Sequence, residues 1–369
     1  MKRIGKLWDY VTDKINILIA FRKARKGKST RECVKVIERD LDFYLSEVQY
    51  MLKDHNFTTS TYKQKTIREP KKRTIFILPF FPDRIIQHAL MNICEPILEN
   101  LMYYHSYACI PGKGIHPASL LTKQYVSTNN YVLKCDVSKF YPSINHDVVM
   151  DVLENVFKDP NILWLFEDIV YSIDGRKNLP IGNYVSQWMG NLYLDGLDHF
   201  IKDTLRIKNY VRYCDDFILF DKNRERLEQA AVELQQYLIE YRGLTLSKCM
   251  IFPSKIGVDF LGYRYFPEDK VLVRKTTAKR MKHRLAELYY IFRHKLDTCE
   301  HINQSLQSIL GWLRWANTRN FTVATDLYKL ENLVYERSIT EDLFDVLKIK
   351  RESKYAHDQY ERWKRYDLR

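Results

Sequence analysis

Residues 211–220 read VRYCDDFILF, and this stretch decides the fold. Apolar, strand-forming residues flank two adjacent aspartates, Asp215 and Asp216, on both sides. The pattern predicts two short strands with the acids at the turn between them. Two adjacent carboxylates disfavour joint ionisation, and a divalent cation such as Mg²⁺, which prefers hard oxygen ligands, removes that penalty. The alternative interpretation of this stretch alone is a polar hairpin turn, where Asp is common.

A second acidic segment lies upstream, at residues 131–144, YVLKCDVSKFYPSI. A β-rich run ends there in Asp136, so we expect Asp136 at the end of a strand. If that strand neighbours the other two in one sheet, the three carboxylates could hold two Mg²⁺ ions about 3.5–4 Å apart, which suits in-line attack on phosphorus. One ion would activate a 3′-hydroxyl group and the other would stabilise the leaving pyrophosphate. Alternatively, Asp136 caps a helix that begins near Ser143.

Together the two segments resemble the palm motifs of reverse transcriptases, with the tyrosine–any–aspartate–aspartate box at Tyr213 to Asp216 and the single acid before it. The resemblance implies an α+β fold of the right-hand polymerase type, with an antiparallel sheet plus helices in fingers and palm and a C-terminal helical thumb. It implies an RNA-directed DNA polymerase that uses two Mg²⁺ ions, for which Mn²⁺ could substitute. The implied metal-binding residues are Asp136, Val137, Asp215 and Asp216.

An aromatic residue, Tyr141, stands five positions after Asp136. In the family that this chain resembles, an aromatic at this place packs under the incoming sugar and excludes a 2′-hydroxyl group. The resemblance therefore implies that Tyr141 selects deoxynucleotides. The alternative is a core aromatic, in a chain that has 26 tyrosines.

Composition agrees with a globular, nucleic-acid-binding protein. The chain has 369 residues, 46% of them hydrophobic, which is enough for two or three packed units. A net charge of +13 favours a polyanionic partner, although basic proteins also coat membranes. No apolar stretch is long enough for a membrane helix. The seven cysteines form no Cys-x-x-Cys pair, so we expect no zinc site and a reduced chain in the cytoplasm. The resemblance implies that the cell is bacterial or phage-infected.

The resemblance, together with the helical periodicity, implies three domains: an N-terminal helical basic extension (1–62), fingers and palm (63–275), and a helical thumb with a charged tail (276–369). In the first we expect one long helix over residues 30–52. In the second we expect a helix over residues 223–242 that ends at Gly243. In the third we expect helices over residues 277–297 and 301–317, with basic residues between their apolar stripes.

The segment 68–79, REPKKRTIFILP, is a basic turn that runs into a β-branched strand, as at the edge of a β-hairpin. Its lysine and arginine side chains could grip a triphosphate, or could simply be solvated. The resemblance to the reverse transcriptase fingers implies nucleotide-binding roles for Lys71 and Arg73, with Arg68 as a third candidate.

Two later segments also resemble the family. Lys248, in LTLSK (244–248), stands where a lysine is proposed to protonate the departing pyrophosphate, a role that suits a general acid. It could equally be a surface lysine. Leu261, Gly262 and Tyr263, in DFLGY (259–263), resemble the primer-grip hairpin, where a glycine would let the backbone approach the primer closely.

The most discriminating segment is LPIGNYVSQ, residues 179–187. Most reverse transcriptases have glutamine where Ile181 stands and a serine–proline at the end, where this chain has serine and Gln187. The pattern resembles the reverse transcriptases of diversity-generating retroelements, and implies nucleotide-binding roles for Ile181, Gly182 and Gln187. Isoleucine lacks the polar contacts of glutamine, so nucleotide selection would be looser. The alternative is that Ile181 only packs.

The resemblance implies that the enzyme copies a template-repeat RNA from a primer with errors opposite adenine, and that the cDNA then replaces a variable region of a target gene. It also implies a basic accessory variability determinant protein as a partner, and no membrane. Two other classes remain open. One is a group II intron or retron-type reverse transcriptase of ordinary fidelity, and the other is an RNA-binding protein on an inactive polymerase scaffold.

Overall fold

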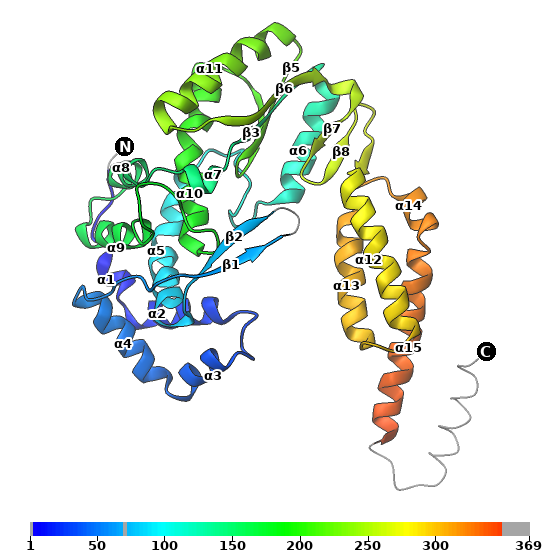
Figure 1. Ribbon diagram of the computed structural model, residues 1–369, viewed down its shortest axis with the longest axis horizontal. Coiled ribbons are helices and arrows are strands. Elements are labelled where there is room, and N and C mark those ends of the chain that lie inside the picture. Colours follow the sequence, from blue (N-terminus) through cyan, green and yellow to red (C-terminus); the bar gives the residue numbers. More distant parts are fainter. Residues whose placement is uncertain (1–2, 69–71, 349–369) are drawn as a thin grey trace. The chain divides into compact units, whose positions relative to one another are not determined.

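The computed structural model describes residues 3–68 and 72–348 of the chain, which forms two compact units, Met1–Ile256 and Gly257–Arg369 (Figure 1). The predicted α+β class is confirmed, because helices combine with antiparallel sheets along the described chain. The division after Ile256 separates two hydrophobic cores. The domain boundaries expected at residues 62 and 275 stay a prediction. Among the described residues no helix is both long and apolar enough to span a bilayer.

The helices of the first unit are α1 (Trp8–Val11), α2 (Lys14–Arg25), α3 (Glu32–Arg39), α4 (Leu41–Lys53), α5 (Ile85–Leu101), α6 (Ile115–Thr128), α7 (Phe140–Ser143), α8 (His146–Val156), α9 (Pro160–Val170), α10 (Tyr184–His199) and α11 (Arg224–Arg242). Its strands are β1 (Lys63–Ile67), β2 (Arg73–Ile77), β3 (Tyr131–Val137), β4 (Asn209–Tyr213), β5 (Asp216–Asp221) and β6 (Leu246–Pro253). A kinked turn η1 (Phe80–Arg84), where Phe81 has extended backbone angles, a π-helical turn η2 (Phe200–Thr204) and a 3-10 turn η3 (Ser254–Ile256) complete it.

The centre of the first unit is a four-stranded antiparallel sheet in the order β4-β5-β3-β6. Strand side chains alternate between faces, so Cys135 and its partner Phe217 share one face while Asp136 and its partner Asp216 share the other. Helix α11 packs on the sheet on the first face, in a core that includes Phe217 and residues of α10. Helix α6 packs on part of the second face, where the ring of Tyr125 lies 5.7 Å from that of Phe220. The two acids therefore lie on the face opposite α10 and α11.

The N-terminal helices share the core of this unit, with α2 packed on α5 and α4 (Figure 1). The single long helix expected over residues 30–52 is wrong. The chain breaks at Asp40, where φ is −138° and ψ is 58°, between α3 and α4. The apolar stripe continues across the break, but α3 packs on η1 whereas α4 packs on α2. Tertiary packing therefore overrides the local helical pattern.

The second unit begins with a three-stranded antiparallel sheet and continues as a helical bundle. Its elements are β7 (Val258–Phe260), β8 (Tyr263–Tyr265), β9 (Val271–Val273), α12 (Lys275–Arg293), α13 (Cys299–Leu313), α14 (Arg319–Ala324) and α15 (Leu327–Lys348). Leu285, Leu306 and Leu330 are buried in the core that joins α12, α13 and α15. Helices α12 and α13 match the two that the periodicity predicts, and α11 with its left-handed Gly243 (φ 60°) matches the third.

Candidate active site

The three predicted acids meet where β3, β4 and β5 come together. Asp136 is the Cα partner of Asp216 across β3 and β5, and Asp215 lies in the turn between β4 and β5. The backbone amide of Val137 donates a hydrogen bond of 3.1 Å to the carbonyl of Asp215, which ties the end of β3 to this turn. Asp136 is not a helix cap, because Asn145 caps α8 through its side chain. The sheet thus joins acids that lie 79 and 80 residues apart in sequence.

The environment of Asp216 suits a bound cation. The pKa of Asp216 is raised to about 6, because burial and the charges of Asp136 and Asp215 raise it by more than Lys134 and Lys248 lower it. Asp216 Oδ1 is buried and has no hydrogen-bond partner among the described residues, whereas Oδ2 lies 3.7 Å from Lys134 Nζ. A half-buried carboxylate whose buried oxygen is unused, beside two other acids, is a hard-oxygen donor set of the kind that Mg²⁺ prefers.

The side chains are not arranged as a closed metal cage. Within residues 3–68 and 72–348, no group of three or more His, Cys, Asp or Glu side chains has the geometry to hold a metal ion. The backbone brings Asp136 and Asp216 into register, and Asp215 lies in the adjacent turn. The donor chemistry therefore fits a divalent ion, while the ligand set of Asp136, Val137, Asp215 and Asp216 stays a prediction.

A buried polar network supports the acidic turn. The sequence pattern did not reveal this network. Arg212 and Asp198 of α10 are both fully buried, and Arg212 donates to Asp198 from Nε at 2.7 Å and from Nη2 at 2.5 Å. Arg212 Nη1 also donates to Asn191 Oδ1 at 3.1 Å and to the carbonyl of Cys214 at 3.3 Å. Cys214 has a left-handed φ of 55°, which costs a non-glycine residue about 1–2 kcal/mol. The sequence feature that could have revealed this network is an arginine inside an apolar strand.

Lys248 lies beside the acids, as its proposed role requires. It is the Cα partner of Asp136 across β3 and β6, and its side chain is exposed. The register shifts by a bulge between Asp136 and Val137, and the hydroxyl of Ser247 donates to the carbonyl of Asp136 at 3.0 Å. Bulges next to active sites commonly re-aim a side chain. The structure thus places a cation within the electrostatic reach of Asp216.

Tyr141 lies against the helix that follows the discriminating loop. A Cβ atom at Gly190 of α10 would stand 3.4 Å from the Tyr141 hydroxyl oxygen, so the glycine makes room for this ring. Burial raises the pKa of Tyr141, and the neighbouring Cys214 and Asp215 raise it further. Tyr141 therefore packs beside the acidic turn, which is compatible with both a core role and sugar selection.

The predicted nucleotide-binding segments meet at β2. The amide of Phe76 donates to the carbonyl of Ile181 at 2.8 Å, and a Cβ at Gly182 (φ 121°) would stand 2.5 Å from the carbonyl oxygen of Phe76. Only glycine fits at 182, because both the backbone conformation and the space exclude a side chain. The loop that contains Ile181 and Gly182 thus packs closely against the hairpin of β1 and β2.

The remaining candidates of this group have different settings. Arg73 begins β2 and is exposed, on the same strand face as Ile75, which contacts the Gly182 position. Gln187 is exposed in the first turn of α10. Arg68 is also exposed, next to β1, whereas Lys71 lies outside the described residues. Their contacts with a nucleotide stay a prediction.

The primer-grip candidates lie in the second unit, in the turn between β7 and β8. Leu261 (φ 52°) and Gly262 (φ 85°) form a two-residue turn in which both residues are left-handed. A Cβ at Gly262 would stand 2.6 Å from Trp312 Cζ3, and the buried Tyr263 donates its hydroxyl to the Trp312 carbonyl at 2.9 Å. The close neighbour of this glycine is therefore a tryptophan of the same unit.

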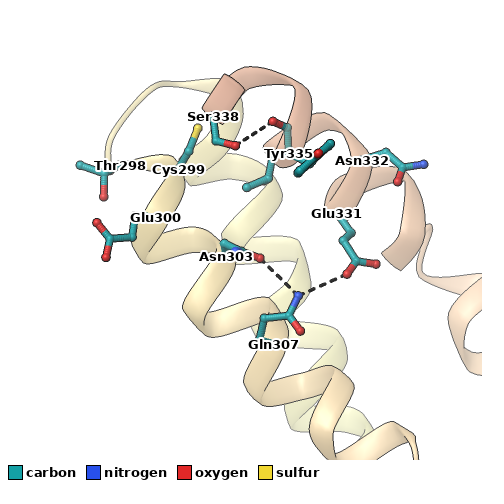
Figure 2. A pocket seen from close by; sticks show the side chains of 10 residues that line it. Thr298, Cys299, Glu300, Asn303, Gln307, Glu331, Asn332, Tyr335 and Ser338 are labelled. Atoms are coloured by element: carbon teal, nitrogen blue, oxygen red, sulfur yellow. Dashed lines mark hydrogen bonds between the residues drawn. The ribbon is translucent and has the colours of Figure 1, made fainter. Parts of the chain in front are cut away.

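The second unit also contains a cavity of about 750 Å³ between α13 and α15 (Figure 2). The side chain of Gln307 points across it and donates to Asn303 Oδ1 and to Glu331 Oε1, each at 3.3 Å. Carboxylate and amide groups line this cavity, which disfavours a phosphate-bearing ligand. We therefore place it outside the candidate active site.

The comparisons with known proteins agree with this geometry. A family model described as reverse transcriptase (RNA-dependent DNA polymerase) matches residues 62–265, more than half of the chain. Two curated proteins with similar sequences are YkfC of Escherichia coli (23% identical, covering 51% of this chain and 61% of that protein) and the putative COX1/OXI3 intron 2 protein of Saccharomyces cerevisiae (25% identical, 49% and 29%).

The group II intron-encoded protein LtrA of Lactococcus lactis is also similar, at 22% identity over 48% of this chain and 32% of that protein. The chain thus spans less than two thirds of the length of these curated relatives. Among solved structures, telomerase from Candida albicans in complex with a fragment of telomeric RNA gives a TM-score of 0.47 at 13% identity, covering 78% of this chain and 61% of that one.

Proposed function

The chain belongs to the reverse transcriptase family, and on that premise we propose that it is an RNA-directed DNA polymerase. The observation that carries this proposal is the register of β3 against β5 and β6, which sets Asp136 opposite both Asp216 and Lys248. Three carboxylates and one lysine side chain at one end of the sheet are the groups that nucleotidyl transfer needs. The substrates are a template RNA, a DNA or RNA primer and deoxynucleoside triphosphates.

Each side chain has a role in the proposed reaction. Asp136, Asp215 and Asp216 would hold two Mg²⁺ ions, and these ions would supply activation of the primer 3′-hydroxyl and charge neutralisation on the leaving pyrophosphate. Lys248 donates a proton to the pyrophosphate as its negative charge develops. Tyr141 excludes a 2′-hydroxyl by its volume, and Arg73 binds phosphate oxygens.

We further propose that this polymerase is of the diversity-generating type, in which template-repeat RNA is copied with errors opposite adenine. The support is Ile181, in the loop before α10, together with Gln187 in the first turn of that helix. The carbonyl of Ile181 accepts from the Phe76 amide, and its side chain is a hydrocarbon with no hydrogen-bonding group. Without the amide that glutamine would provide, fewer polar contacts enforce pairing geometry. A basic accessory variability determinant protein is the expected partner.

The relatives favour one other candidate function. LtrA and the yeast protein are intron-encoded by name, and this chain resembles them over about half of its length. A group II intron or retron-type enzyme would copy adenines as accurately as the other bases. The error spectrum therefore separates the two proposals.

The test is sequencing of cDNA that the purified chain makes from a primed RNA template with Mg²⁺ and deoxynucleotides, with and without any accessory protein encoded beside it. We expect synthesis that Asp215→Asn abolishes, with errors concentrated opposite template adenine. Ile181→Gln should reduce those errors by up to about tenfold, the factor for one net hydrogen bond. Ile181→Leu, which stays apolar, is the matched control and should retain them.

The other outcomes are equally informative. Accurate synthesis by the wild type would assign the chain to the intron or retron type. RNA binding without any synthesis, under all these conditions, would contradict the polymerase and leave an RNA-binding protein.

A further inference from the structure

Two cysteines face each other across the central sheet, directly next to the catalytic candidates. Cys135 of β3 is the Cα partner of Cys249 of β6, and their sulfur atoms lie 4.0 Å apart. Cys135 is fully buried, whereas Cys249 is exposed. Reagents in solution can therefore react with the Cys249 sulfur. The Cys135 sulfur is shielded from solvent but lies close to Cys249.

The strand register already meets the backbone requirement for a disulfide. Directly opposed residues of an antiparallel pair have Cα atoms about 4.5–5.5 Å apart. Disulfides form at Cα separations of about 4.4–6.8 Å. Closing the sulfur–sulfur distance from 4.0 Å to about 2.05 Å thus needs side-chain rotation and a small shift of the strands.

We propose that Cys135 and Cys249 are a reversible redox-modification site, at which a small-molecule disulfide converts the two thiols into a cross-strand disulfide between β3 and β6. Nothing in the proposed polymerase reaction uses either sulfur, so the site is additional to it.

The exchange proceeds in two balanced steps. The Cys249 thiol loses its proton to solvent and attacks one sulfur of the small disulfide, which forms a mixed disulfide and releases one small thiolate. Cys135 then loses its proton and attacks the Cys249 sulfur, which forms the cross-strand bond and releases the second small thiolate. Two cysteine thiols are oxidised by two electrons in total, and one small disulfide is reduced to two thiols.

The bond would act on the acidic site from the other face of the same strands. Asp136 and Lys248 are the next opposed pair along β3 and β6, and their side chains lie on the opposite face from the sulfur atoms. Drawing the strands together at 135 and 249 displaces this pair. A misplacement of about 1 Å can cost about 100-fold in rate, so oxidation should inhibit synthesis. This consequence rests on the proposed function, whereas formation of the bond does not.

A second thiol pair provides an internal comparison. Cys109 and Cys214 are hydrogen-bonded through their side chains, but neither lies in a strand, and their φ angles are 58° and 55°. No strand register sets their Cα separation. We therefore assign the modification to Cys135 and Cys249.

The first experiment is peptide mapping by mass spectrometry, without reduction, of the full chain treated with oxidised glutathione. We expect a linked pair of peptides that contain Cys135 and Cys249, lack two hydrogen atoms and separate on treatment with dithiothreitol. Cys249→Ser should abolish the link, and the matched variant Cys109→Ser should retain it. A link only between Cys109 and Cys214, or only glutathione adducts on Cys249, would overturn the proposal.

The second experiment measures initial rates of cDNA synthesis before and after the same oxidation. Wild-type activity should fall by on the order of tenfold or more and return on reduction. Cys249→Ser should start at wild-type activity and resist the oxidant. If the link forms without a change in rate, the inhibitory effect is wrong while the modification site stands. If no variant or wild-type chain synthesises DNA, the mass readout still decides the site.

Discussion

Two hairpin turns of this chain are built alike in length and differently in chemistry. The turn at Cys214–Asp215 joins β4 to β5, and the turn at Leu261–Gly262 joins β7 to β8, each through two residues. Both place a non-glycine residue in the left-handed region, Cys214 at φ 55° and Leu261 at φ 52°, but the first has a buried ion pair beneath it, whereas the second has Gly262 against a tryptophan ring. The turn that carries the candidate catalytic acids is thus supported by buried hydrogen bonds. The turn at Leu261–Gly262 is supported by close packing against Trp312.

The largest effect should come from breaking the polar support of the acidic turn. Asp198→Ala leaves the fully buried Arg212 without its counter-charge, and removing one partner of a buried pair costs about 3–5 kcal/mol. Urea unfolding should therefore show a loss of that size for the unit that contains the four-stranded sheet.

The double variant Arg212→Met with Asp198→Leu sharpens this result. Apolar residues of similar volume can replace a buried pair at little cost, so part of the lost stability should return. The buried hydroxyl of Tyr210, which donates to Asp198 Oδ1, still loses its acceptor, at a cost of about 1–3 kcal/mol. Synthesis should stay impaired, because the hydrogen bond from Arg212 to the carbonyl of Cys214 is lost. Full activity in the double variant would show that the network serves stability alone.

An intermediate effect is expected at the second turn. In Gly262→Ala the new Cβ would lie 2.6 Å from Trp312, so overpacking adds about 1–3 kcal/mol to the cost of the left-handed backbone. Gly175→Ala is the matched control, since Gly175 has φ 97° with nothing within 4 Å of the new atom. Urea unfolding should show a greater loss for Gly262→Ala, and equal losses would contradict the role of Trp312.

The smallest effect should appear as a pH dependence beside the buried network. Burial lowers the pKa of His199, but its hydrogen bond with Asp203 and the charges of Asp195 and Asp203 outweigh burial and raise the pKa above its usual value. A raised pKa means that the charged imidazole stabilises the fold below about pH 6.5 and that this contribution is lost as pH rises through the folded-state pKa. The Tm difference between wild type and His199→Gln should therefore shrink from pH 6 to pH 8. A constant difference would contradict it.

Local pattern was sufficient where strands and helices follow their own side-chain periodicity. The strands on both sides of Asp215 and Asp216, the end of a strand at Asp136, and the helix that stops at Gly243 are all as predicted. The break at Asp40 was not predictable, because the apolar stripe continues through it and only the packing of α3 on η1 and of α4 on α2 separates the two helices.

The candidate active site likewise combines features that the sequence determined with features that depend on tertiary structure. The sequence by itself determined which acids are present, their order, and the strand–turn–strand that presents two of them, because alternation and turn propensity are local properties. Only the tertiary structure decided that β3 lies between β5 and β6, which sets Asp136 against Asp216 and Lys248 and sets Cys135 against Cys249. It also decided that Arg212 meets Asp198 beneath the turn. Pairing between distant strands depends on the burial of a shared apolar face, and no single segment of sequence contains that information.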